Sequence, residues 1–321
     1  VLAMHLLKKV SLFCTCAVLL LACPAMADTS WPTKPVTLMV SNSVGGMVDV
    51  TSRILADGML KILGQPLVIQ NKPGAGGQIC LRYVARSQPD GYTVFSGNIT
   101  TPLAATELAG KNLLNLDDYE FVGGFLPNER ALYIHADAPF KTWEEFVAYA
   151  KAHPDTLSIG FGGNQWSYEL MKYVTAKAGI QCKLINYKSG GDASADFFGR
   201  HIDIVELGVG TPVYQAALEG KARMLIVTSG NQIPHFDAPR LLDKGYPYPI
   251  LSEFGLLMPK GTPQEIISKM EAALETVLKD PETLKKMHTL GAQARFISGK
   301  DLKARCLEVR KGIREMKADQ K

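Results

Sequence analysis

The stretch Leu38-Met39-Val40-Ser41-Asn42-Ser43-Val44-Gly45-Gly46-Met47-Val48-Asp49-Val50, residues 38–50, decides the architecture predicted for this chain. An apolar run ends in small polar residues, two glycines follow, and a helical pattern continues to about Leu63. This order predicts a strand, a tight turn and a helix. Such a turn directs unpaired N–H groups and the positive end of a helix dipole toward one point, which makes it a candidate anion-binding loop. The alternative is an ordinary strand-to-helix connection in which Asp49 caps the helix.

The same pattern continues through the first hundred residues. Strands are predicted at 36–40, 66–70 and 92–95, and the helices between them at 48–63 and 79–87. This β-α-β-α-β order predicts a parallel sheet with helices on its faces. Ligands bind beyond the carboxyl ends of such strands. Ser43, Asn98 and the glycine-rich turn at 71–77 are expected at that edge.

A second α/β unit follows. Thr142 and Glu145 form a capping-box pattern that predicts a helix start. Glycine-rich turns at 161–165 and 188–192 each follow a predicted strand and precede a helix. Two such units predict two lobes that face each other across a cleft. The tail after Gln264 has helical spacing and is expected to pack on the first lobe, so that the chain crosses between lobes near 125 and near 255.

The amino-terminal 27 residues have the parts of a secretory signal. Lys8 and Lys9 precede an uncharged apolar run at 10–22, and Ala25-Met26-Ala27 fits a cleavage site, with Asp28 as the first mature residue. The run is short for a membrane span. A lipoprotein box ending at Cys23 is the competing interpretation. Because Leu21 suits that box poorly and Ala25-Met26-Ala27 is a good cleavage site, a soluble exported protein is favoured.

Charge and cysteine content exclude several classes of protein. The signal removes two of 35 basic residues and none of 31 acidic ones, which leaves a net charge of +2 and argues against a nucleic-acid partner. Cys80, Cys182 and Cys306 remain, and their wide spacing and odd number argue against a disulfide framework or a Cys-rich metal site. Three buried thiols are expected, with one disulfide as the alternative.

The sequence lacks the common catalytic and cofactor motifs. It contains no P-loop, no GxGxxG, no GxSxG and no HExxH, and no histidine pair has i,i+4 spacing. Tyr187-Lys188-Ser189 has residue types found in catalytic clusters, but no base partner is visible, and a strand end followed by a solvated turn is the simpler interpretation. We therefore predict no enzyme activity, no cofactor and no metal.

Several segments together resemble the extracytoplasmic receptors of tripartite tricarboxylate transporters, the Bug receptors. No one segment is specific, but they occur in the family's order and cover essentially the whole mature chain. They are Trp31-Pro32 to Lys34-Pro35, Gly45-Gly46 with Asp49, residues 71–77, 89–93, 160–164, Tyr187-Lys188 with Gly190-Gly191, Ile202-Asp203, 227–229 and 261–263.

The resemblance implies a two-lobed periplasmic-binding-protein fold of type II, the Venus-flytrap α/β fold, with a ligand cleft between the lobes. The expected divisions of the chain are a signal peptide at 1–27, a first lobe at 28–125 with 256–321, and a second lobe at 126–255. It also implies capture of a small carboxylate, such as an amino acid, a citrate-like acid or an aromatic acid. The residues expected to bind it are Asn42, Ser43, Val44, Gly45, Gly46, Asp49, Asn98, Phe161, Gly162, Gly163, Asn164, Gln165, Trp166, Tyr187, Ser189 and Glu206.

The sequence also departs from the family pattern. Phe161 and Trp166 intrude in a loop that is usually small and polar, and Glu206 replaces a polar pair. The two aromatic rings would either offer a flat apolar wall to a ring or apolar body, or pack inside the second lobe. Glu206 would either meet an ammonium group or be solvated.

The leading hypothesis is therefore a monomeric periplasmic solute receptor that delivers a small carboxylate to membrane transporter subunits. Three alternatives remain open. They are a ligand sensor for a signalling partner, an α/β enzyme using Lys188 or Glu206, and a surface lipoprotein anchored through Cys23.

Overall fold

The computed structural model describes residues 31–110, 114–127, 129–162, 165–247, 252–290 and 292–319. The signal-peptide prediction, the Cys23 alternative and the predicted site residues Gly163 and Asn164 lie outside the described residues. The chain divides into a short unit, Val1–Trp31, and a second unit, Pro32–Lys321, which holds every helix and strand discussed below.

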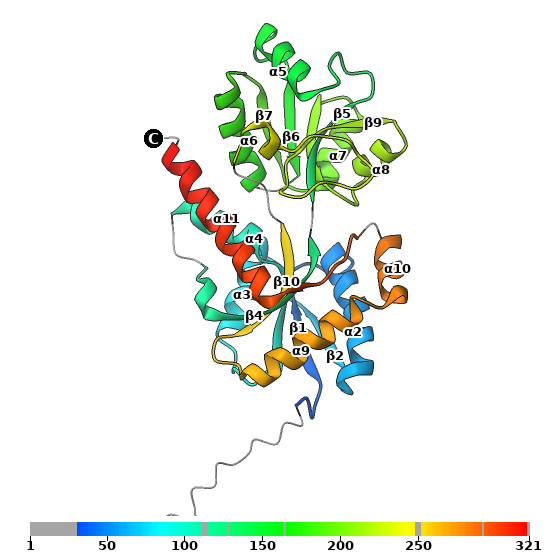
Figure 1. The fold of residues 1–321 in the computed structure, drawn as a ribbon, viewed down its shortest axis with the longest axis vertical. Helices are drawn as coiled ribbons and strands as arrows, with labels where there is room; N and C mark the ends of the chain where they lie inside the picture. Colours follow the sequence, from blue (N-terminus) through cyan, green and yellow to red (C-terminus); the bar gives the residue numbers. More distant parts are fainter. Residues whose placement is uncertain are drawn as a thin grey trace, which may run out of the picture. The chain divides into compact units, whose positions relative to one another are not determined.

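Two sheets organise the second unit (Figure 1). The first sheet has the strand order β11-β4-β10-β3-β1-β2. Its strands are β1 Val36–Val40, β2 Leu67–Asn71, β3 Thr93–Asn98, β4 Tyr119–Pro127, β10 Glu253–Pro259 and β11 Ile297–Ser298. The helices of this first lobe are α2 Met47–Leu63, α3 Gln78–Ala85, α4 Thr100–Ala109, α9 Gln264–Val277, α10 Pro281–Thr289 and α11 Gly299–Asp319.

The second sheet has the order β7-β6-β8-β5-β9. Its strands are β5 Arg130–His135, β6 Ser158–Gly162, β7 Lys183–Tyr187, β8 Ile204–Gly208 and β9 Ala222–Val227. The helices of this second lobe are α5 Trp143–Ala152, α6 Gln165–Ala178, α7 Gly190–Phe198 and α8 Pro212–Leu218. The chain passes from β4 to β5 at 127–130 and returns to the first sheet at β10.

Strand directions match the predicted β-α-β units. β1 pairs in parallel with both β2 and β3, and β6 pairs in parallel with β7 and β8. β10 is antiparallel to β3 and β4, and β5 is antiparallel to β8 and β9. The carboxyl ends of β1 and β3 therefore share one edge of the first sheet, and those of β6 and β8 share one edge of the second.

Helix α2 shows why the opening stretch folds as predicted. Val48, Leu55, Met59 and Leu63 are buried, which gives the helix one apolar face. The helix ends at Gly64, whose φ of 71° is left-handed and whose N–H bonds to the carbonyl of Leu60. Glycine adopts this conformation without steric cost, so the stop is encoded locally.

The sequence pattern does not predict helix α4. Its residues Thr100, Pro102, Leu103, Ala104 and Thr106 are buried with little helical periodicity. The helix contacts both α11 and α6, so more than one of its faces is covered. A helix buried on several sides has no amphipathic stripe to reveal it.

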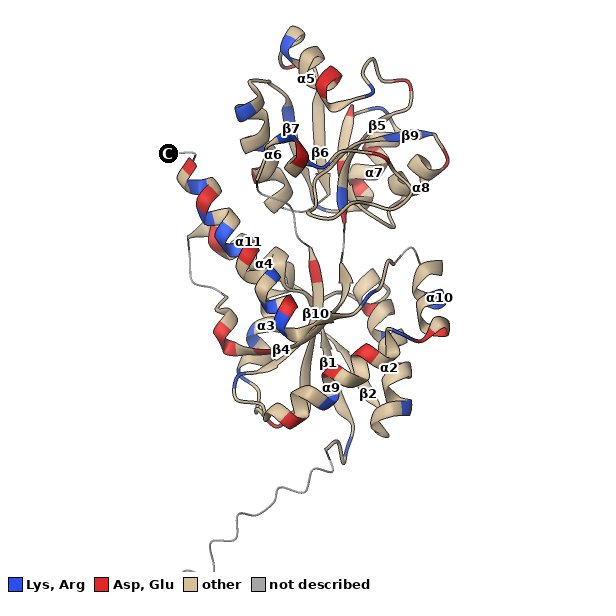
Figure 2. Cartoon of the chain, viewed as in Figure 1, with Lys and Arg blue, Asp and Glu red and all other residues tan. Residues whose placement is uncertain are grey.

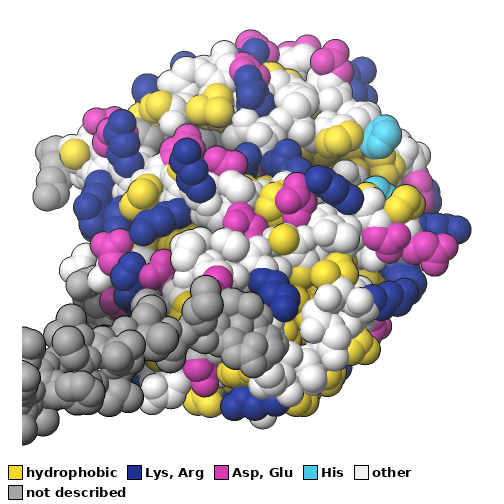
Figure 3. All heavy atoms as spheres, turned by 60° about the horizontal axis from the view of Figure 1, so that its bottom comes forward, with side chains coloured by type: hydrophobic (Ala, Val, Ile, Leu, Met, Phe, Trp, Pro, Cys, Tyr) yellow, Lys and Arg dark blue, Asp and Glu magenta, His cyan; other side chains and the backbone are white. Residues whose placement is uncertain are grey.

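Charges of both signs occur along the described helices and strands (Figure 2). Lysine, arginine and acidic residues alternate along α11 (Figure 2), and Figure 3 shows the two signs interspersed over the face it presents. In the described part of the chain, no helix combines the length and the apolar character needed to cross a membrane.

The capping box of α5 provides a test of local folding. The Glu145 N–H donates to Thr142 Oγ1 at 3.2 Å, and the Thr142 N–H donates to the Glu145 carboxylate at 3.2 Å. We expect Thr142→Ala to lower the free energy of unfolding by about 0.5–2 kcal/mol, because one helix-terminal donor loses its acceptor. Urea unfolding followed by circular dichroism measures this, and Thr142→Ser should stay close to wild type. Equal losses in both variants would contradict the capping role.

Candidate ligand-binding cleft

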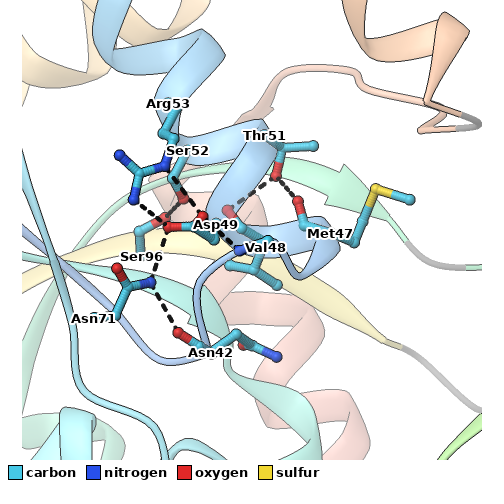
Figure 4. A network of polar contacts seen from close by, with 10 residues as sticks. Asn42, Met47, Val48, Asp49, Thr51, Ser52, Arg53, Asn71 and Ser96 are labelled. Atoms are coloured by element: carbon cyan, nitrogen blue, oxygen red, sulfur yellow. Dashed lines mark hydrogen bonds and ion pairs between the residues drawn. The ribbon is translucent and has the colours of Figure 1, made fainter.

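The loop between β1 and α2 is organised by Asp49 (Figure 4). The buried Asp49 carboxylate accepts hydrogen bonds from the Gly45 N–H at 2.9 Å and from Asn71 Nδ2 at 2.8 Å. Arg53 adds a bidentate ion pair, with Nη2 to Oδ1 at 2.9 Å and Nε to Oδ2 at 3.1 Å. These contacts hold the pKa of Asp49 down at about 2, mainly through the Arg53 hydrogen bond and against the opposing effect of burial.

This network changes the predicted role of the glycine pair. The Gly45 N–H bonds to Asp49, and the Gly46 N–H bonds to the Ser43 carbonyl at 3.2 Å. The two donors that were expected to hold an anion are therefore used to close the turn. Asp49 acts on the loop's shape, since its oxygens face protein donors.

A polar cavity of about 350 Å³ lies at the carboxyl ends of β1 and β3. It is lined from the first lobe by hydroxyl and amide side chains and by the glycine-rich turn at 73–77, and from the second lobe by two residues. The lining consists of Ser41, Asn42, Ser43, Pro73, Gly74, Gly76, Gly77, Asn98, Thr101, Ser252, Phe254, Arg130 and Gly162. We call it the polar cavity.

Asn98 connects the three segments of this wall. Its Nδ2 donates to Ser252 Oγ at 2.8 Å, and its Oδ1 accepts from the Thr101 N–H at 2.7 Å. The amide thus ties the end of β3 to the start of α4 and to the residue before β10. The prediction from sequence found Asn98 but not Ser252, which is 154 positions away.

A second cavity of about 200 Å³ shares Arg130, Gly162 and Phe254 with the first. Its other lining residues are mostly apolar: Met47, Leu126, Pro127, Leu207, Val209 and Ala292, with Glu129, Gly190, Gly208, Gly210, Thr211 and Gln293. We call it the apolar cavity. Gly162 is required where the cavities meet, because a Cβ there would come within 2.7 Å of Gly190 and of Leu207.

Arg130 is held by a buried ion pair. Its Nε donates to Glu206 Oε1 at 2.8 Å and its Nη2 donates to Oε2 at 2.6 Å. Thr228 Oγ1 also donates to Glu206 Oε1, at 3.0 Å. Arg130 is 7 % exposed and Glu206 is fully buried. Sequence reasoning missed Arg130, although a glutamate following the apolar strand 202–205 requires a cation or several donors nearby.

Only some of the predicted residues meet at the cavities. Asn42, Ser43, Asn98 and Gly162 line the polar cavity, whereas the solvent-exposed Val44 and the two glycines Gly45 and Gly46 are absent from both linings. The expectation that Glu206 faces the ligand or solvent is wrong, because its carboxylate is buried against Arg130 and lines neither cavity.

The aromatic pair of the second lobe lies in the core. Phe161 and Trp166 are buried in one hydrophobic cluster with Ile159, Leu170 and Val174, and they line neither cavity. Of the two alternatives that the sequence left open, packing inside the second lobe is the one found. The apolar wall at the cavities comes from other residues.

Three further predicted residues serve local structure. Gln165 accepts from Asn186 and donates to Glu169. Tyr187 donates to Asp196 at 2.7 Å, and burial, together with that hydrogen bond, raises its pKa to about 12. Ser189 caps α7 by accepting from the Asp192 N–H. Among the described residues, no cluster of His, Cys, Asp and Glu could hold a metal ion.

The sequence matches a family model and several known proteins. The family model described as tripartite tricarboxylate transporter family receptor matches residues 51–308. A protein encoded in the gbd 5′ region of Cupriavidus necator is 33 % identical over 279 residues, which are 83 % of this chain and 82 % of that protein. BugT of Bordetella pertussis is 28 % identical over 284 residues, covering 85 % and 84 % of the two chains.

Solved structures show the same fold. A TctC solute-binding protein from Polaromonas superposes with a TM-score of 0.79 at 27 % identity and covers 90 % of this chain and 99 % of its own. The Rpa4515 protein of R. palustris, solved with adipate, has a TM-score of 0.69 at 24 % identity, with 89 % and 98 % covered. At that identity the second likeness concerns the fold alone.

The Asp49 network predicts a pH-dependent contribution to stability. Because the folded-state pKa is lowered, the contribution is complete above the unfolded-state pKa near 3.8 and is lost as the pH falls toward 2. We expect Asp49→Asn to lower the free energy of unfolding at pH 7 by about 1–3 kcal/mol, since four charge-assisted hydrogen bonds from three partner residues weaken. The gap between the melting temperatures of wild type and variant should narrow from pH 4 to pH 2.

Asp57→Asn is the matched control, because Asp57 is an exposed carboxylate on the same helix. Asp57→Asn should change the free energy of unfolding by no more than about 0.5 kcal/mol at every pH. A constant gap between wild type and Asp49→Asn across pH 4 to pH 2 would show that the carboxylate charge is not the stabilising element.

Proposed function

Because the chain belongs to the tripartite tricarboxylate transporter receptor family, we propose that it captures a small carboxylate-bearing solute and presents it to the membrane subunits of such a transporter. Receptors of this family are solute-binding proteins of the periplasm. The observation that carries the carboxylate assignment is the polar cavity. Its donors come from both lobes and gather where open α/β sheets bind their ligands.

In the first lobe, we assign ligand binding to four polar side chains of the polar cavity: Asn42, Ser43, Asn98 and Thr101. Amide and hydroxyl groups donate hydrogen bonds to carboxylate oxygens without bringing a competing negative charge. The adipate held by the R. palustris protein is consistent with a carboxylate in this fold. We assign no chemical step to the site, in keeping with the receptors of the family.

The predicted lobes are 28–125 with 256–321 and 126–255, and we propose that each boundary lies a few residues further into the crossing, since β4 continues to Pro127 and β10 begins at Glu253. The two lobes are proposed to close on the solute by hinge motion at the two chain crossings. Closing would bring Arg130 and Gly162 of the second lobe toward the first-lobe donors of the polar cavity. The closed form would then differ from the open form at the surface that the membrane subunits meet.

A thermal-shift screen tests the ligand class. Protein refolded from denaturant, and therefore free of carried-over solute, is mixed with acetate, butyrate, hexanoate, benzoate, malate or adipate. A carboxylate at about one hundred times its Kd stabilises the folded protein by about 2.7 kcal/mol and should raise Tm by several degrees. Neutral sugars and alkyl amines are the controls. A Tm rise with these controls and with none of the carboxylates would refute the proposed function.

Export is tested at the mature amino-terminus. We propose cleavage after Ala27, so mass spectrometry of the protein recovered from the periplasm of an expressing bacterium should find a free Asp28. Replacing Ala27 with a bulky residue should leave the precursor uncut. An acylated Cys23 would instead establish a lipoprotein.

A further inference from the structure

The two cavities meet at one cation. Arg130 lines both of them and is nine-tenths buried. Its guanidinium cannot rotate freely, because Nε and Nη2 are both bound to the Glu206 carboxylate, which Thr228 also contacts. In the described part of the chain Nη1 has no hydrogen-bond partner, which leaves this nitrogen for a solute.

The charges around Arg130 limit how many carboxylates the site can take. Glu206 already neutralises the positive charge of the Arg130 guanidinium. One bound carboxylate would therefore give Arg130, Glu206 and the solute together a net charge of −1. Glu129 adds a further acid to the apolar cavity, where it accepts from Asn231 at 2.7 Å and lies 3.9 Å from Arg295. A second carboxylate in that cavity would meet like charge and apolar walls.

The apolar cavity suits a hydrocarbon group. Met47, Leu126, Leu207 and Phe254 contribute walls from both lobes. Burying a methylene group there is favourable by the ordinary hydrophobic effect. A polar cavity and an apolar cavity on either side of one arginine match a molecule with a charged head and an apolar body.

We propose that the solute is a monocarboxylate with an apolar body, that Arg130 binds its carboxylate through Nη1, and that the apolar cavity receives the body. Glu206 is the positioning residue, since it orients Arg130 and does not line either cavity. This inference rests on the proposed function and narrows its ligand class.

A chain-length series measures the role of the apolar cavity. Calorimetric titration of the refolded wild-type protein with acetate, butyrate and hexanoate should give an affinity gain of about fourfold for each added methylene. Hexanoate should bind more tightly than adipate, which has the same length and a second carboxylate. Equal affinities along the series, or tighter binding of adipate, would overturn the assignment of the apolar cavity.

A paired substitution measures the role of Arg130. Arg130→Met with Glu206→Gln removes both charges together, so that no buried charge is left without a partner. We expect at least a tenfold loss of hexanoate affinity at nearly unchanged secondary structure. The control is Arg310→Met with Glu107→Gln, a partly buried contact between α11 and α4 in which Glu107 also binds the exposed Arg314; it lines neither cavity. The control should bind hexanoate as wild type does.

Arg130→Lys is the second variant, in case the pair does not fold. Lysine keeps the charge but cannot form the two parallel hydrogen bonds to Glu206, so hexanoate affinity should fall between wild type and the paired variant. Unchanged affinity in the folded variants would overturn the role of Arg130 and leave the proposed function intact. If wild type binds no carboxylate at all, the proposed function itself fails.

Discussion

The buried ion pair between Arg130 and Glu206 is the interaction on which the rest of the site depends. Two ions removed from water are tolerated only when geometry and hydrogen bonding are close to ideal, and here the contact is bidentate and supported by Thr228. Removing one partner of such a pair typically costs about 3–5 kcal/mol. The pair joins the first residue of β5 to a residue of the neighbouring strand β8, so the position of the arginine is set by the sheet itself.

The glycine-rich loops show a different kind of constraint. Gly74, Gly76 and Gly77 all have positive φ, which lets the chain turn tightly at the wall of the polar cavity. In contrast, the Gly45 N–H donates to the Asp49 carboxylate and the Gly46 N–H donates to the Ser43 carbonyl. Glycines at the start of a helix therefore mark a sharp turn, and whether that turn binds an anion depends on what else accepts from its N–H groups.

Much of the fold could be predicted because its signals are local. The strands β1 and β6, the end of α2 at Gly64 and the capping box of α5 follow from periodicity, glycine conformation and short-range hydrogen bonding. The burial of Trp166 also has a local signal, since Trp166, Leu170, Tyr173 and Val174 form one helical face of α6.

The cavities could be predicted only in part because they are built from distant segments. Asn98 meets Ser252, and Arg130 meets Glu206, across separations of 154 and 76 residues. A sequence pattern can show that Glu206 needs a partner, but the register of β5 against β8 decides which cation fills that need. The same holds for the apolar walls, since Leu126 and Phe254 come from paired positions of β4 and β10.

Ligand contact and lobe movement involve the same short segments. Arg130 opens β5 directly after one crossing between the sheets, while Ser252 and Phe254 lie directly after the other. Between the latter two, Glu253 is buried and pairs with Arg305 of α11 at 2.6 Å, and burial raises its pKa. The Glu253–Arg305 ion pair holds the start of β10 against α11 of the first lobe. The Arg130–Glu206 ion pair holds the start of β5 against β8 of the second lobe. A rotation between the lobes would therefore move Arg130 relative to Ser252 and Phe254, and would reshape both cavities in one step.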